Sequence, residues 1–255
     1  MQTPRFNFHR FFLPKEYIHS DYVNFPEPIA RQIRNVLRVR PGEHVIVLDN
    51  HGSKWEVVMQ ELTRENVRGE ILYKTFAGGE PLTKLNLYFS LTRREKMEWI
   101  LQKCTEIGVV SFTPVICINS LARDMVVDVS RKRRWEKIVQ EAAEQSERGK
   151  LPVVNEPAQL HQAIKKVRAG KAQNLVAWEG EKNTSLREVL HGNTFPLQTE
   201  KKINLFIGPE GGFASSEIEL FIKAGVRSFS LGERILRVET AAMVSCALIL
   251  FELEK

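Results

Sequence analysis

The 255-residue sequence is poor in cysteine and contains no long apolar run. Its three cysteines are odd in number, far apart and set in apolar segments (Cys104, Cys117, Cys246). This pattern argues against a disulfide framework and predicts small buried residues in a reducing compartment. No stretch approaches the roughly 18 to 20 apolar residues of a membrane span. The first residues interleave Arg and His with Phe and form no signal-peptide core, so we expect a cytoplasmic protein.

Histidine and charge narrow the function classes further. The six histidines are scattered without a pair at helical ligand spacing, and no Cys/His spacing matches a zinc site, so we expect no metal. The net charge is +6 and the isoelectric point is near 9.2. A basic protein attracts acidic partners without specificity, and nucleic acid is the first candidate.

Up to about Thr75, short β runs separated by turn residues predict a small barrel. The expected strands cover 44–49, 54–62 and 67–74. A helix is expected before them over 28–39, and its apolar side comprises Ile29, Ile33, Val36 and Leu37. The other side carries three arginines with no interspersed acid, Arg31, Arg34 and Arg38. Such a face indicates an anionic ligand, although a plain solvated face would look the same.

The glycine-rich segment 77–81 marks a linker, after which strands alternate with helices. Strands are expected over 85–91, 111–118, 174–178, 203–207 and 228–231. Helices are expected over 95–107 with a stop at Gly108, over 130–148 and 158–167, and from a Ser216/Glu219 capping box to Gly225. This alternation predicts a mostly parallel sheet. We therefore expect a barrel domain over 1–75 and an α/β domain over 76–255.

Two glycine-containing loops near the end of the chain carry the strongest functional signal. They read IGPEGGF over 207–213 and LGERILRVETA over 231–241, and each follows an expected strand. Glycine admits positive φ and lets a ligand approach the backbone, and ligands bind at the carboxyl ends of strands in open α/β sheets. The first loop lacks the features of a phosphate loop or a dinucleotide loop. Alone it fits a tight turn, but the pair predicts two walls of one pocket.

The same two segments resemble the cofactor-binding signature of the SPOUT, or trefoil-knot, methyltransferases. The likeness is specifically to the family that methylates N3 of one uridine in bacterial 16S ribosomal RNA. Further matches follow in the same order at 10–12, 36–38 before Pro41-Gly42, 95–103 and 144–148. The resemblance implies a C-terminal α/β trefoil-knot domain, a small PUA-like N-terminal β-barrel, S-adenosylmethionine as cofactor and a homodimer. Pattern alone predicts an unknotted, doubly wound sheet.

In that family the cofactor lies against the knot loops, and backbone groups bind its adenine. Carried to this sequence, the cofactor-binding residues are Ala177, Glu179, Ile207, Gly208, Gly211, Gly212, Leu231, Gly232, Ile235, Leu236, Arg237 and Thr240. Because uracil N3 carries a proton, its methylation calls for a base and for a cation near the developing negative charge. The catalytic candidates are Glu210 and Glu239 as acids or bases and Arg234, with Arg237, as the cation. Two structural alternatives stay open: Glu210 as a helix cap, and Glu239 as an ion-pair partner of Arg237 or Arg234.

Arginines in three segments are candidates for contacts with RNA phosphates, namely Arg10, Arg31, Arg34, Arg38, Arg131, Arg133 and Arg134. Arg10 precedes Phe11 and Phe12, and arginine beside aromatics suits contacts with the RNA backbone and bases. Both phenylalanines also fit a barrel core. The run 131–134 begins a helix at its positive end, a position that favours an external anion. A solvated surface is the alternative.

The segment after Thr240 is apolar nearly all round, which predicts a helix covered on most sides. The resemblance implies that part of it packs in the homodimer, so a charge at Leu250 is expected to disrupt assembly. Three functions fit the sequence. They are a methyltransferase acting on 16S ribosomal RNA or the small ribosomal subunit, a non-catalytic RNA-binding or ribosome-associated protein, and a nucleotide-dependent enzyme that uses GPEGG for phosphate. Only the first requires both glycine loops.

Overall fold

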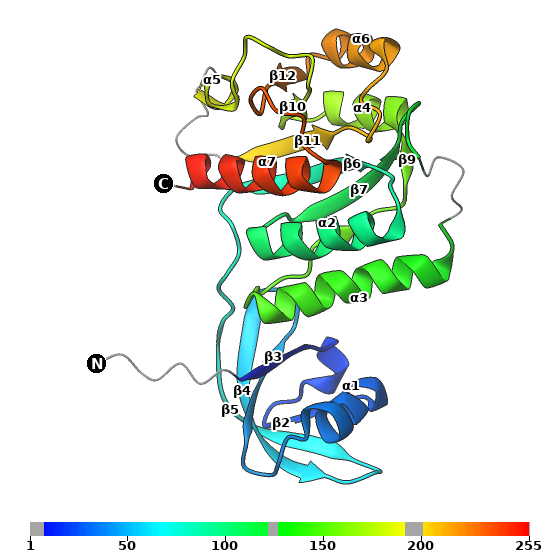
Figure 1. Cartoon of the computed structure of the whole chain (residues 1–255). Coiled ribbons are helices and arrows are strands. Elements are labelled where there is room, and N and C mark those ends of the chain that lie inside the picture. The colour runs from blue at the N-terminus through cyan, green and yellow to red at the C-terminus, as the bar shows by residue number, and fades with distance from the viewer. Residues whose placement is uncertain (1–7, 122–126, 192–200, 255) are drawn as a thin grey trace. The chain divides into compact units, whose positions relative to one another are not determined.

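The computed structural model describes residues 8–121, 127–191 and 201–254. The chain divides into two compact units. The N-terminal unit comprises residues 1–80 and 143–151, and the C-terminal unit comprises residues 81–142 and 152–255. Figure 1 labels most of the helices and strands.

The N-terminal unit is built on a five-stranded sheet with the order β1-β3-β4-β5-β2. Its strands are β1 His9–Phe12, β2 Tyr22–Asn24, β3 His44–Leu48, β4 Ser53–Leu62 and β5 Val67–Phe76, with a short 3-10 helix, η1, at Lys15–Tyr17. β1 runs parallel to β3, whereas the other neighbours are antiparallel. The three expected strands are therefore confirmed. Phe11 and Phe12 are both buried, which confirms the interpretation of these residues as core.

The helix predicted over 28–39 is wrong in its detail. An α-helix, α1, covers Glu27–Arg31 and continues as a π-type helix, η2, over Gln32–Leu37. Arg38 follows the last turn with a φ of 53°. A π-type turn is wider than an α-turn, so the 100° spacing of side chains does not apply. Val36, expected on the apolar side, is 71% exposed, whereas Ile29, Ile33 and Leu37 pack in the core as expected. Arg38 lies after the helix and so does not share its face with Arg31 and Arg34.

A short segment far along the sequence completes the N-terminal unit. Ala143 is fully buried in a cluster with Phe12. Arg148 is also buried, and its guanidinium lies 2.9 Å from the carboxylate of Glu80. A buried charge is costly unless it is paired, so this ion pair ties segment 143–151 to the end of the unit's first stretch of chain.

The C-terminal unit is an α/β domain around a parallel sheet, as predicted. The strand order is β12-β10-β11-β6-β7-β8, and β9 also pairs with β7. The strands are β6 Lys84–Ser90, β7 Ser111–Ile116, β8 Val153–Val154, β9 Ala158–Gln159, β10 Gln173–Ala177, β11 Lys202–Ile207 and β12 Arg227–Phe229. All of these pairings are parallel. The loops that follow the strands therefore leave at one edge of the sheet.

Helices cover both faces of this sheet. The first face packs against α2 Arg94–Ile107, α5 Leu186–His191 and α7 Val238–Leu253, together with α3 Val129–Gln145. The second face packs against α4 Leu160–Arg168 and α6 Ser215–Lys223. Side chains alternate between the two faces along β6. Leu85, Leu87 and Phe89 pack against the first set of helices, whereas Tyr88 packs against the second.

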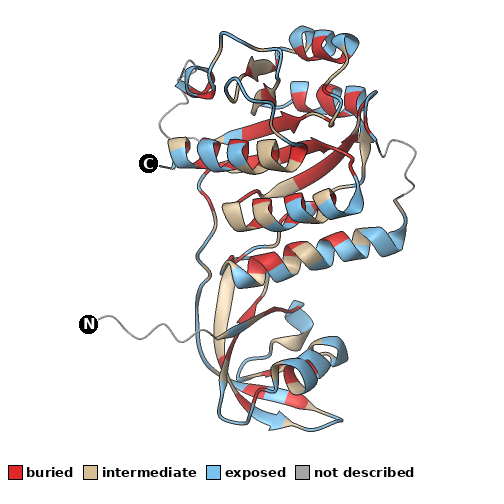
Figure 2. Ribbon diagram, in the orientation of Figure 1, coloured by how far each residue is buried: buried red, intermediate tan, exposed pale blue. Residues whose placement is uncertain are grey.

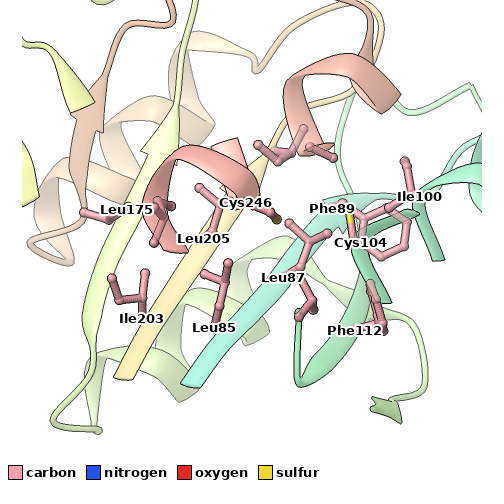
Figure 3. Packing of buried hydrophobic residues seen from close by; sticks show 14 of the residues in the cluster. Leu85, Leu87, Phe89, Ile100, Cys104, Phe112, Leu175, Ile203, Leu205 and Cys246 are labelled. Carbon is pink, nitrogen blue, oxygen red and sulfur yellow. The ribbon is translucent and has the colours of Figure 1, made fainter. Parts of the chain in front are cut away.

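The core on the first face is a large cluster of apolar side chains. Figure 3 shows side chains of β6 and β11 beside Cys104 of α2 and Cys246 of α7. All three cysteines are buried free thiols, as predicted. In Figure 2 the central strands of this unit are almost wholly buried. No helix in the described part of the chain is long and apolar enough to cross a membrane.

Helix ends test the finer expectations. α2 ends at Gly108 with a φ of 121°, which confirms the expected stop. The predicted Ser216/Glu219 capping box is wrong, because the carboxylate of Glu217 accepts the N–H of Ala214 at 2.9 Å instead. α6 thus begins at Ser215, ahead of the residue expected to cap it.

Candidate cofactor and catalytic site

The two glycine loops meet, as predicted, around a cavity of about 430 Å³. Its lining includes Lys96, Ala177, Glu179, Ile207, Gly208, Pro209, Glu210, Gly211, Gly212, Ile235, Leu236, Arg237, Val238 and Ala241. A smaller cavity of about 60 Å³ shares the walls of Ala177, Glu179, Ile235 and Leu236 and adds Leu231, Gly232 and Arg234. Of the residues predicted for this site, only Thr240 and Glu239 line neither cavity.

Gly212 is favoured in the first loop for two physical reasons. Gly212 has a φ of 70°, a backbone conformation that residues with a Cβ rarely adopt. A Cβ built on Gly212 would also meet Oε1 of Glu179, on the loop after β10, so that this carboxylate would have to move aside. The positive φ is therefore the strict requirement for glycine at this position, because the flexible carboxylate of Glu179 can rotate away from an added side chain.

Side chains from other loops hold the first loop in place. The amide of Asn119, in the loop after β7, donates to the carbonyl oxygens of Gly211 at 3.3 Å and Gly212 at 3.0 Å. The buried carboxylate of Glu217 accepts the N–H of Ile118 at 2.9 Å as well as that of Ala214. These bonds join the loops after β7 and β11. Asn119 carries no motif, and sequence reasoning missed it.

The second loop presents its side chains outward. Gly232 has a φ of 104°, and its N–H donates to the hydroxyl of Ser230 at 3.2 Å. Ile235 lines both cavities although its side chain is 87% exposed. Arg234 and Arg237 are exposed at the smaller and the larger cavity respectively. An exposed isoleucine at a cavity wall is suited to contact with an apolar part of a ligand.

Glu210 and Glu239 converge on one ammonium group. Oε1 of Glu210 accepts from Thr92 at 2.5 Å and from Lys96 at 3.1 Å. Oε2 of Glu239 lies 3.7 Å from the same ammonium. The helix-cap alternative for Glu210 is therefore wrong, since Glu217 caps α6, and the ion pair of Glu239 is with Lys96 rather than with the two predicted arginines.

Sequence reasoning assigned no role to Thr92 or Lys96. Lys96 lies within the matched segment 95–103, which is the one signal that could have pointed to it. Burial raises the pKa of Glu210, but hydrogen bonds from Thr92 and Lys96 and the ammonium charge outweigh it. The pKa of Glu210 is thus below its usual value, and this carboxylate is ionised at neutral pH.

The seven arginines predicted for RNA contact fall into two groups. Arg10, Arg34 and Arg134 are held by acids, at 2.8 Å from Glu147, 3.2 Å from Glu27 and 2.5 Å from Glu98 respectively. The Arg134 bond, against the opposing effect of burial, lowers the pKa of Glu98 to about 2. Arg31, Arg38, Arg131 and Arg133 are exposed.

The chain thus combines a parallel α/β unit, which has two glycine loops and paired carboxylates at one edge, with a small β unit. Comparison with protein-family models identifies this combination as an RNA methyltransferase. The model described as an RNA methyltransferase domain matches residues 79–250, and the model described as an RNA methyltransferase PUA domain matches residues 28–72.

Individual relatives make the assignment more specific. Ribosomal RNA small subunit methyltransferase E of Synechocystis sp. is 31% identical over 94% of this chain and 76% of that protein. Its namesake in Bacillus subtilis is 28% identical over 88% of each chain. The crystal structure of the Neisseria gonorrhoeae protein of that name, bound to S-adenosylmethionine, superposes with a TM-score of 0.83 at 29% identity, over 96% of this chain and 98% of that one. The chain belongs to the ribosomal RNA small subunit methyltransferase E family.

The family confirms the enzyme class, the cofactor and the α/β fold with a PUA domain that the sequence predicts. The knot, the roles of individual site residues and the homodimer stay predictions.

Replacing Gly212 by Val is expected to weaken binding of S-adenosylmethionine by about 3 kcal/mol, roughly a hundredfold, because the added side chain displaces the Glu179 carboxylate at the cavity wall and enters the space proposed for the cofactor. Isothermal titration calorimetry on the folded variant measures this change. Gly225→Val is the matched control: Gly225 also has positive φ, at 73°, but a Cβ there meets nothing within 4 Å. Unchanged affinity in Gly212→Val, or an equal loss of affinity in both variants, would contradict the site.

Proposed function

We propose that this chain methylates N3 of a uridine in 16S ribosomal RNA, with S-adenosylmethionine as methyl donor. The observation that carries the proposal is the cavity between the two glycine loops, with the carboxylate of Glu210 in its wall. Relatives named for methylation of small-subunit ribosomal RNA and a structural neighbour bound to this cofactor support it. We extend the proposal to a cytoplasmic location.

The residues present fit the cofactor. Gly211 and Gly212 line the cavity without side chains, and Ile235 offers an apolar surface. When bound, the cofactor supplies a methyl group on a sulfonium that leaves as a neutral thioether. Backbone groups of the loops would hold it, and the proposed contacts are Ala177, Glu179, Ile207, Gly208, Gly211, Gly212, Leu231, Gly232, Ile235, Leu236, Arg237 and Thr240.

The chain's own residues handle the proton and the charge of the uracil. N3 must lose its proton as its bond to the methyl carbon forms, and a nearby carboxylate, Glu210 or Glu239, accepts that proton. Negative charge develops on the uracil oxygens, and the exposed guanidinium of Arg234 stabilises it. Positioning of the two reactants supplies much of the remaining rate enhancement.

Four of the seven arginines predicted for RNA contact form no ion pair with a described residue, and they are the best candidates for contacts with RNA phosphates. Arg31 and Arg38 lie in the N-terminal unit, and Arg131 and Arg133 lie at the start of α3. We assign RNA affinity mainly to residues 1–75 and the methyl-donor site to residues 76–255. Arg10, Arg34 and Arg134 would need to leave their carboxylate partners before they bound phosphate.

A homodimer is proposed from the outer side of α7. Val244, Leu248 and Phe251 recur at helical spacing and are 37%, 45% and 67% exposed. Clustered exposed apolar side chains are typical of an interaction surface. Leu250 is only 6% exposed and packs in the core, so the expectation that it lies in the interface is wrong. A charge at Leu250 would disrupt folding rather than assembly.

The first test is chemical. Purified protein is expected to bind S-adenosylmethionine but not ATP or NAD in calorimetric titrations, and to transfer a labelled methyl group to unmodified 16S RNA or small subunits. Nucleoside mass spectrometry of the product should show 3-methyluridine. Cofactor binding without any transfer to either substrate would favour a non-catalytic RNA-binding protein, and tight ATP or NAD binding would favour another enzyme class.

Replacing Arg31 and Arg38 together by Gln is expected to lower RNA affinity and to reduce the slope of log affinity against log salt by about one for each phosphate that the variant no longer neutralises. Filter binding at several salt concentrations measures the slope. Arg34→Gln is the matched control, because its guanidinium is already committed to Glu27 and to the carbonyl of Thr63 at 2.8 Å. An unchanged slope in the double variant would make Arg31 and Arg38 plain solvated side chains.

Phe251→Glu is expected to convert dimers into monomers or aggregates, since it places a charge in an apolar interface. Sedimentation velocity at micromolar concentration measures the change. Ile222→Glu on α6, at a side chain that is 68% exposed, is the control that adds the same charge elsewhere. A wild-type monomer that binds cofactor normally would refute the dimer.

A further inference from the structure

Lys96 occupies a place in its helix that is locally unfavourable. It is the third residue of α2, in the first turn, where the helix dipole disfavours a cation. A residue that breaks a local rule is commonly explained by a wider interaction. Here the ammonium lies between two carboxylates, 3.1 Å from Glu210 and 3.7 Å from Glu239.

The hydrogen bonds of Glu210 are one-sided. Its Oε1 accepts from both Thr92 and Lys96, whereas its Oε2 is buried and has no hydrogen-bond partner within the described ranges. A buried polar atom without a partner is rare and calls for an explanation. Glu210 lines the cavity, so a donor on a bound molecule is the partner that fits.

Glu239 completes the cluster from behind the cavity wall. Its Oε2 is likewise buried without a hydrogen bond to any described residue, and its carboxylate is 13% exposed. One ammonium between two carboxylates leaves one negative charge in excess. The charge of Lys96 is therefore shared, and it anchors Glu210 without fully neutralising it.

We propose that Lys96 is a positioning residue for Glu210. With Thr92 it fixes Oε1 of Glu210 and leaves Oε2 to accept the N3 proton of the uracil, while Glu239 holds the ammonium from the other side. The assignment rests on the proposed function, and it selects Glu210 of the two carboxylates as the proton acceptor.

Several charged groups border Glu210 and bear on its protonation. Lys96 of α2 pairs with Glu210 and also with Glu239 of α7, whereas Arg237 of the second glycine loop and Glu179 after β10 line the same cavity. Only Lys96 makes an ion pair with Glu210 among the described residues. Because the active form of Glu210 is ionised, activity is lost as the pH falls through its pKa. Removal of the ammonium raises that pKa, so the acid limb of the pH profile moves upward.

The test measures single-turnover methyl transfer to 16S RNA from pH 5 to pH 9, with cofactor affinity measured separately by calorimetry without RNA. Lys96→Met is expected to lower the rate at pH 7 about tenfold or more and to move the acid limb up by about one pH unit. Lys96→Arg, which keeps the charge, should restore most of the rate and the wild-type limb. Thr92→Val should move the limb in the same direction by less.

Lys103→Met is the matched control, because Lys103 lies on the same helix and pairs with Glu106 at 2.8 Å. It should leave the rate and the profile unchanged. A Lys96→Met enzyme with the wild-type profile overturns the proposal, and so does a tenfold loss of cofactor affinity with an unmoved acid limb, which would make Lys96 a cofactor-binding residue. If Lys96→Met does not fold, the Thr92→Val variant tests the proposal, since it should also move the acid limb of the pH profile upward. An unmoved acid limb in that variant would overturn the proposal. Failure of the wild-type enzyme to methylate uridine N3 would instead overturn the proposed function.

Discussion

Parallel pairing throughout the C-terminal sheet is the constraint on which its chemistry depends. β12, β10, β11, β6 and β7 are neighbours in that order, so the loops after them leave the sheet at the same edge. Glu179, Glu210 and Thr92 are distant in sequence, yet they follow adjacent strands β10, β11 and β6. An antiparallel strand among these would send its loop to the opposite edge and remove one side of the site.

Gly212 gives the first loop its backbone conformation, and hydrogen bonds from other side chains hold that loop in place. The conformational freedom that lets Gly212 approach Glu179 also carries an entropic cost on ordering. Asn119 and Glu217 counter it with hydrogen bonds to the backbone of the loop, and Glu217 is buried, which strengthens them. Asn119 and Glu217 do not line the larger cavity themselves, but they hold in place the loop that does.

The sequence predicts the parts of this protein whose cause is local. Strand and helix alternation, the stop at Gly108 and the two glycine loops all follow from nearby residues, and the structure agrees with them. Interactions created by strand order escape such reasoning. Lys96 and Thr92 meet Glu210 only because β6 pairs with β11. No spacing of residues along the chain predicts that pairing. The π-type turn over 32–37 and the contribution of 143–151 to the N-terminal unit are likewise features that no local sequence pattern predicts.

The net charge of the whole chain and the charge of the cluster at Glu210 have opposite signs. The whole chain carries +6, which favours approach to RNA through long-range attraction. The cluster of Lys96, Glu210 and Glu239 instead has one negative charge in excess, in a partly buried place where salt screens little. Salt screens the interaction between exposed charges and a distant cluster. The net positive charge of the chain therefore does not cancel the negative charge of the Lys96, Glu210 and Glu239 cluster. The net positive charge suits a polyanionic substrate, and the negative cluster suits a cationic donor and the acceptance of one proton.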